Sequence, residues 1–132
     1  YQGQMSANIT FDSGLAKRMY AGADLFLMPS QFEPCGLSQM IAMRYGALPI
    51  VRQTGGLNDT VRSCQLGQED GTGFVFADYN AFDMQYVIRQ AVDLYAMDHK
   101  RFAAVQQNAM TTDFSWGASA RAYEALYRRI CN

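Results

Sequence analysis

The sequence predicts an α/β domain in which helices cover a parallel β-sheet. Two segments, "DLFLMP" at 24–29 and "LPIVR" at 48–52, are nearly continuous apolar runs, as strands are when helices cover both faces of a parallel sheet. Helical patterns separate the strand-like segments over residues 1–79, and three consecutive helical patterns fill residues 80–132. We therefore expect one domain with strand–helix units in its first part and C-terminal helices in its second.

The strand candidates are short apolar segments. They lie at residues 5–9, 24–29, 48–52 and 73–77. A helix is expected between the first two, over residues 12–23, because Asp12 or Ser13 can cap its start and Gly22 suits a left-handed end.

A second helix is expected over residues 36–46, between the strands at 24–29 and 48–52. Its apolar side chains repeat at helical spacing and predict an apolar face, formed by Leu37, Met40, Ile41 and Tyr45. Gly46 again suits a left-handed helix end.

Three helices are expected after the last strand. Asn80 can cap a helix over residues 81–97, and Ser115 can cap one over 116–130. The helix between them covers 99–110.

Three smaller features also have expected places. Trp116 is expected to anchor the last helix, with stacking on a sugar as the alternative. His99, the only histidine, is expected on the surface. The segment 66–73, rich in glycine and acidic residues, is expected to be a surface loop.

Composition and charge argue against several classes of protein. The 132 residues are 49% hydrophobic and 17% charged, which is typical of a globular domain. Eleven basic and twelve acidic residues give a net charge of −1, so we expect no nucleic-acid or membrane surface. The three cysteines are widely spaced and indicate neither a disulfide framework nor a zinc site, so we expect reduced thiols in the cytoplasm.

The loop "SQFEPCG" after the strand at 24–29 holds the first candidate site residues. Ligands of parallel α/β sheets bind at the carboxyl ends of the strands, where this loop must lie. Glu33 offers a carboxylate there. The next helix begins with amide groups that can meet an oxygen-rich ligand, those of Cys35, Gly36 and Leu37. The residues alone leave a second interpretation open, in which Glu33 only caps the helix or faces solvent.

A second loop follows the next strand. In "VRQTGGLNDTV", Gly55 and Gly56 present backbone amides and Thr54 a hydroxyl at the same end of the sheet as Glu33. A double glycine is also common in ordinary turns, and neither Walker nor GxGxxG spacing is present. We expect the two loops to face one crevice.

Together these segments carry a resemblance to a known family. "GADLFLMPSQFEPCGLSQMIAMRYGALPIVRQTGGLNDTV", with "GTGFVF" and "DFSW" further on, resembles the C-terminal half of bacterial glycogen synthases and plant starch synthases. The resemblance implies part of the C-terminal Rossmann-like domain of a GT-B glycosyltransferase. It also implies transfer of glucose from ADP-glucose to the non-reducing end of an α-1,4-glucan, with retention and with no metal or other cofactor.

The resemblance further implies roles for single residues. Glu33 matches the acidic group that accepts from a hydroxyl of the donor glucose and supports charge developing at the anomeric centre. Phe11 matches an aromatic residue that stacks on adenine, with core filling as the alternative, and Ser38 matches a threonine near the nucleotide. Two backbone segments match the surroundings of the donor: Cys35, Gly36 and Leu37 beside the sugar hydroxyls, and Thr54, Gly55 and Gly56 beside the pyrophosphate and glucose.

Some parts of the family's site have no match in these residues. The arginine–lysine pair that clamps the diphosphate precedes the matching segment in the family, and other site residues belong to the N-terminal domain. Arg44 and Arg52 are not expected to replace the pair, since each is better explained as an exposed helix charge or a strand-end contact. We therefore expect a piece of a longer protein that is inactive alone, lacks the N-terminal GT-B domain and self-associates.

Related transferases carry a second glutamate eight residues after the first, where this chain has Ile41. This difference favours the glycogen and starch synthase group. Two alternatives stay open: a non-catalytic module that binds nucleotide sugars, and a GT-B transferase that uses UDP-glucose. The resemblance places the parent protein in the bacterial cytoplasm, or in the plastid if the parent is from a plant.

Overall fold

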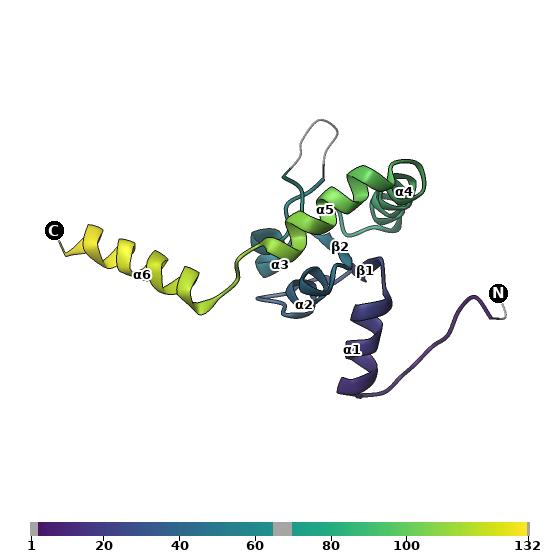
Figure 1. The fold of residues 1–132 in the computed structure, drawn as a ribbon, viewed down its shortest axis with the longest axis horizontal. Coiled ribbons are helices and arrows are strands. Elements are labelled where there is room, and N and C mark those ends of the chain that lie inside the picture. Colours follow the sequence, from purple (N-terminus) through teal and green to yellow (C-terminus); the bar gives the residue numbers. More distant parts are fainter. Residues whose placement is uncertain (1–2, 65–69, 132) are drawn as a thin grey trace.

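The computed structural model describes residues 3–64 and 70–131. Within them, helices and strands follow in the order α1 (Ser13–Gly22), β1 (Leu25–Met28), α2 (Ser38–Tyr45), β2 (Leu48–Arg52), α3 (Gly55–Thr60), β3 (Phe74–Phe76), α4 (Ala81–Met97), α5 (His99–Thr111) and α6 (Trp116–Ile130) (Figure 1). None of the described helices is long and apolar enough to span a membrane.

The three described strands form one parallel sheet in the order β1-β2-β3. Met28 is paired with Val51, and Arg52 with Phe76, so all three strands end at the same edge. The central strand β2 is almost wholly buried, which explains its continuous apolar sequence. The predicted α/β class and the parallel sheet are thereby confirmed.

Helices α2, α4 and α5 pack against this sheet, and α5 also packs against α2 and α4. The core is formed by apolar side chains from α2, α4, α5 and the strands β2 and β3, and from α3 and its end: Met43, Leu48, Ile50, Val51, Leu57, Val61, Phe74, Phe76, Val87, Ala91, Phe102, Val105 and Ala109. Helix α1 lies beside α2, where Tyr20 contacts the rings of Phe26 and Tyr45 at centroid distances of 5.2 and 6.2 Å. The sheet and three helices therefore form the body that positions the loops at the strand ends.

Side-chain caps begin three helices where the sequence predicted them. Asp12 accepts from the amides of Gly14 and Leu15, while Asn80 and Ser115 each accept from an amide in the first turn of α4 and α6. At the helix ends the result is mixed. Gly46 ends α2 with φ of 86°, as predicted, but Gly22 remains inside α1, which ends in extended backbone at Ala23.

The predicted packing face of α2 is wrong. Leu37, Ile41 and Tyr45 are 64%, 41% and 44% exposed. The buried face instead carries Gln39, with Ala42 and Met43. The face with Leu37, Ile41 and Tyr45 has more apolar residues, so the sequence favoured it. The structure instead buries Gln39, whose amide nitrogen finds hydrogen-bond partners inside the protein.

Two further elements differ from the sequence-based expectation. Residues 5–9 form no strand and are exposed, because no described strand lies beside them to complete a ladder. Gly55–Thr60 forms the short helix α3. The sequence did not predict it, because glycine is a poor helix former and two glycines begin it.

The segment 66–73 is only partly a surface loop. Residues 66–69 lie outside the described part of the chain. Thr72 is fully buried, and its hydroxyl accepts from the amide of Arg62 at 2.9 Å. The end of the segment therefore belongs to the packed region before β3.

Helix α6 extends away from the body of the molecule (Figure 1) and has no buried residue. Its first residue, Trp116, is 90% exposed, so the prediction that it anchors the helix is wrong for the described chain. Ser115 donates to Asp113 from its amide, and the hydrogen bonds from Ser115 and the Arg121 guanidinium hold the pKa of Asp113 below its ordinary value. His99 is exposed, as predicted, and its ring stacks on Phe102 at 6.2 Å.

The isolated chain is expected to self-associate through the outer edge of β1. Among the described strands β1 pairs only with β2, and Leu27 on it is 42% exposed. An open apolar edge strand pairs readily with another chain. Light scattering of the purified chain should give a mass above that of the monomer, and Leu27→Lys should lower it because a charged edge opposes pairing. Gln107→Lys, which adds the same charge on α5, is the control and should leave the mass unchanged; a wild-type monomer at high concentration would contradict the expectation.

Candidate functional site

Two loops meet at the carboxyl edge of the sheet. The first runs from β1 to α2 and contains Glu33 and Pro34, and the second joins β2 to α3. The amide of Gly56 donates to the carbonyl oxygens of Glu33 and Pro34, at 3.2 Å each. The loops predicted to face one crevice are therefore in direct backbone contact.

The double glycine is what allows this contact. A Cβ atom on Gly56 would lie 1.9 Å from the carbonyl oxygen of Cys35, and one on Gly55 would lie 2.1 Å from that of Glu33. Gly55 also has φ of 43°, a conformation that other residues seldom adopt. The glycines thus serve close packing between the loops, and the amide of Gly56 is engaged within the protein.

Arg52, at the end of β2, binds the backbone of the first loop. Its guanidinium donates to the carbonyl of Ser30 at 3.0 Å and to that of Gln31, and lies over the ring of Tyr79 at 5.6 Å from its centroid. The prediction of a strand-end contact for Arg52 is confirmed. One cation therefore joins the first loop to the connection that leads into α4.

Gln39 joins the same loop to α3. Its amide nitrogen lies 2.8 Å from the carbonyl of Gly36, 3.3 Å from that of Cys35 and 3.1 Å from the hydroxyl of Thr60. The Thr60 hydroxyl in turn donates to the carbonyl of Gly56 at 2.6 Å. Together with the bonds from the Gly56 amide to Glu33 and Pro34, these hydrogen bonds form a closed network between the two loops, which we call the circuit.

The residues predicted around the sugar surround this junction. Glu33 is half-buried, and among the described residues its carboxylate has no hydrogen-bond or ion-pair partner. Cys35 and Leu37 are exposed, and Gly36 has φ of 72°. In the described part of the chain the amides of Cys35, Gly36 and Leu37 donate to no protein group, so they are available to a ligand.

Other predicted residues lie around or away from the junction. Thr54 is the half-buried N-cap residue of α3, and Ser38 is the first residue of α2. Phe11 is fully exposed just before α1, so it fills no core among the described residues. Because its side chain is fully exposed, Phe11 packs against neither loop within the described residues.

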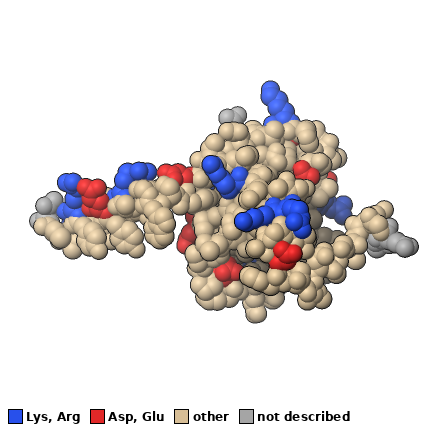
Figure 2. All heavy atoms as spheres, turned by 60° about the horizontal axis from the view of Figure 1, so that its bottom comes forward, with Lys and Arg blue, Asp and Glu red and all other residues tan. Residues whose placement is uncertain are grey.

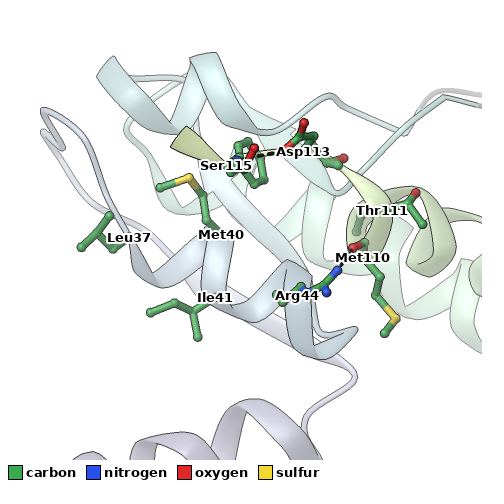
Figure 3. A pocket seen from close by; sticks show the side chains of 11 residues that line it. Leu37, Met40, Ile41, Arg44, Met110, Thr111, Asp113 and Ser115 are labelled. Atoms are coloured by element: carbon green, nitrogen blue, oxygen red, sulfur yellow. Dashed lines mark hydrogen bonds between the residues drawn. The ribbon is translucent and has the colours of Figure 1, made fainter. Parts of the chain in front are cut away.

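A separate hollow of about 690 Å³ lies between α2 and the end of α5 (Figure 3). Met40 and Ile41 line one side, and Arg44 reaches across to donate to the carbonyl of Met110 at 2.9 Å. It shares only Leu37 with the predicted site residues. The hollow is therefore distinct from the junction of the two loops.

Neither charged residues nor possible metal ligands indicate a second candidate site among the described residues. Figure 2 shows acidic and basic residues close together on α6 and on the rest of the visible face. No three His, Cys, Asp or Glu side chains of residues 3–64 and 70–131 gather as a metal ion would require. Cys64 is half-buried, and burial raises the pKa of its thiol despite Arg101 nearby.

Sequence reasoning missed the residues that brace the junction, Gln39 and Thr60. One signal was available: a glutamine between apolar positions on a helix that leads from a candidate site. Its meaning depended on the second loop, because Thr60 is 21 residues away in the sequence.

Comparison with known proteins gives a consistent result. A model of the family described as "Glycosyl transferases group 1" matches residues 5–108. Glycogen synthases from Streptococcus mutans and Desulfitobacterium hafniense are 50% and 48% identical to the chain over 98% of its length. The chain spans only 27% and 28% of the length of these curated relatives.

Two solved structures resemble the fold. The catalytic domain of starch synthase IV from Arabidopsis thaliana, bound to ADP and acarbose, superimposes with a TM-score of 0.78 and 44% identity, covering 91% of this chain and 25% of that one. Sucrose-phosphate synthase from Thermosynechococcus elongatus gives a TM-score of 0.54 and 27% identity, covering 84% of this chain and 26% of that one.

Replacing Gly56 by alanine is expected to destabilise the chain strongly. A methyl group 1.9 Å from the Cys35 carbonyl forces the loops apart, and overpacking of this kind costs about 3 kcal/mol or more. Urea unfolding of the variant measures the loss. Gly22→Ala is the matched control, since nothing lies within 4 Å of its Cβ position, and should change stability by less than about 1 kcal/mol. Equal stability of the two variants would show that the loops do not need this approach.

Proposed function

The chain belongs to the group 1 glycosyl transferases, and we propose that it supplies the donor side of the active site of a glycogen or starch synthase. The chain spans 27% of the length of the Streptococcus mutans relative, so the longer protein would perform the reaction. The observation that carries the proposal is the junction of the two loops, which holds an unpartnered carboxylate and available amides at the ligand-binding edge of a parallel sheet.

The proposed reaction transfers glucose from ADP-glucose to the non-reducing end of an α-1,4-glucan, with retention at the anomeric carbon. Support for the nucleotide comes from the Arabidopsis starch synthase, which is similar to this chain and was solved with ADP. The reaction needs no metal in this proposal. The glucan acceptor and the N-terminal domain, which are not part of these 132 residues, would lie opposite the junction of the two loops. The parent protein would work in the cytoplasm of a bacterium.

Glu33 is the residue proposed to act on the reacting sugar. A carboxylate placed beside the anomeric carbon stabilises the positive charge that develops there as the bond to the diphosphate breaks. Glu33 suits this role because it is half-buried and its carboxylate is not neutralised by a described cation. Charge stabilisation is strongest where water is partly excluded.

The amides of Cys35, Gly36 and Leu37 are proposed to donate to the sugar hydroxyls. Their position before α2 adds the positive end of the helix dipole to these three donors. They would fix the ring relative to Glu33 without charged side chains.

The remaining predicted residues are proposed to contact the nucleotide end of the donor. Thr54 and Gly55 would lie beside the pyrophosphate, whereas Gly56 contributes by holding the loops together, because its amide is already engaged. Ser38 would lie near the nucleotide, and Phe11 would stack on the base from its fully exposed position. The proposed donor site is thus built mostly from backbone.

Glu33→Ala in the full-length protein is expected to lower kcat by about a hundredfold or more and to raise the KM for ADP-glucose far less, because the carboxylate acts mainly in the transition state. Transfer of radiolabelled glucose to glycogen measures both constants. Glu124→Ala, on the exposed surface of α6, is the control and should match wild type. A near-normal kcat for Glu33→Ala would remove Glu33 from this role, and faster transfer from UDP-glucose than from ADP-glucose would change the proposed donor.

The isolated 132 residues are expected to transfer no glucose. The diphosphate would meet backbone amides and the Thr54 hydroxyl but no cationic clamp, and no facing domain would exclude water from the reacting centre. The same transfer assay, run with the isolated chain beside the full-length protein, tests this expectation. Measurable turnover by the isolated chain would contradict it.

A further inference from the structure

Gln39 is a polar residue in a place where an apolar one would be expected. Its side chain is fully buried on the face of α2 that also carries Ala42 and Met43. Within the described residues its oxygen Oε1 has no hydrogen-bond partner, which costs free energy. Packing alone would favour an apolar residue at this position, so the polar side chain of Gln39 calls for another explanation.

The surroundings fix how the amide of Gln39 is oriented. Its nitrogen faces three oxygens, from Cys35, Gly36 and Thr60. Exchanging nitrogen and oxygen would set Oε1 against the two carbonyls, which cannot donate a hydrogen bond. The side chain is therefore oriented by the oxygens of the junction, at the expense of Oε1.

The bonds of Gln39 continue into the second loop. Thr60 accepts from Gln39 and donates to the carbonyl of Gly56, whose amide donates back to the carbonyls of Glu33 and Pro34. Two connections cross between the segments: the Gly56 amide reaches the first loop, and Gln39 of α2 reaches Thr60 of α3. A shift of one loop would break bonds at several points of this circuit.

We propose that Gln39 is a positioning residue, which acts through Thr60 and the carbonyls of Cys35 and Gly36 to fix Glu33 against the donor sugar. This inference rests on the proposed function, since it concerns the same site. Gln39 does not reach the ligand itself, because its side chain is fully buried. Its contribution is geometric: small misplacements of a reacting group lower the rate steeply.

Glutamine fits the position better than its close relatives do. A glutamate would turn a charged oxygen toward the carbonyls of Cys35 and Gly36, and an asparagine is one methylene too short to keep the same contacts. Methionine has a similar length and removes the donors. Gln39→Met therefore removes the bonds without leaving a large cavity.

The test uses the full-length protein that contains this chain. In Gln39→Met and in Thr60→Val, kcat for glucosyl transfer from ADP-glucose to glycogen should fall by about tenfold or more, with KM changing by less than about threefold. Thr60→Ser keeps the hydroxyl and should retain at least about half of kcat. The double variant Gln39→Met with Thr60→Val should be little worse than Gln39→Met alone, because both changes open one circuit.

Val105→Ala is the control for a general loss of stability. Val105 is buried in the core on α5, an element that belongs to neither loop. It should lower Tm as much as Gln39→Met or more, with kcat unchanged. If Gln39→Met keeps the wild-type kcat, or if Val105→Ala lowers kcat equally, the positioning role is overturned.

Hydrogen exchange of the full-length protein separates this inference from the proposed function. The peptide that contains residues 54–60, with the Gly56 amide that donates to the first loop, should exchange faster in Gln39→Met and Thr60→Val, but not in Val105→Ala or Thr60→Ser. Absence of glucosyl transfer in the wild type would overturn the proposed function, and the exchange rates would still decide whether Gln39 holds the loop. Unchanged exchange in Gln39→Met overturns the inference.

Discussion

The contact between the Gly56 amide and the carbonyls of Glu33 and Pro34 is the constraint on which the candidate site depends. It exists only because neither glycine of the second loop has a side chain, since a Cβ on Gly56 would lie 1.9 Å from the Cys35 carbonyl. A single hydrogen bond of this kind contributes only about 1 kcal/mol, so its energy alone does not hold the loops. Its importance is steric, because it sets a backbone separation that no other pair of residues permits.

The parallel sheet makes that contact possible, and side chains at its edge secure it. Because β1 and β2 run in the same direction, both loops leave the sheet at one edge. Arg52 then fixes the beginning of the first loop, while Gln39 and Thr60 fix its end against α3. Glu33 lies between these two supports. The part of the loop that carries the proposed chemistry is thus held on both sides, although its own carboxylate has no described partner.

The sequence predicted the features that depend on local signals. The apolar runs at β1, β2 and β3 and the caps Asp12 and Asn80 could each be recognised within a few residues. The meeting of two loops could also be predicted, because it follows from the parallel order of strands.

Features that depend on distant contacts were missed or assigned wrongly. Helix α3 begins with the two residues least favourable to a helix, and contact with the first loop is what requires them. The buried face of α2 was predicted wrongly because the amide nitrogen of Gln39 finds a partner, Thr60, in a distant segment. The engagement of the Gly56 amide within the protein likewise requires the loop-to-loop distance, which no local pattern contains.

The backbone contact between the loops also bears on how such a site can be recombined. Residues 33–39 and 54–60 contact each other through the Gly56 amide and through Gln39 with Thr60. A chimaera with its crossover between these segments would combine the first loop of one protein with helix α3 of another, and their contacts would not match. Grafting donor preference from one transferase to another would therefore require both segments to be moved together with α2 and β2, which separate them in the sequence.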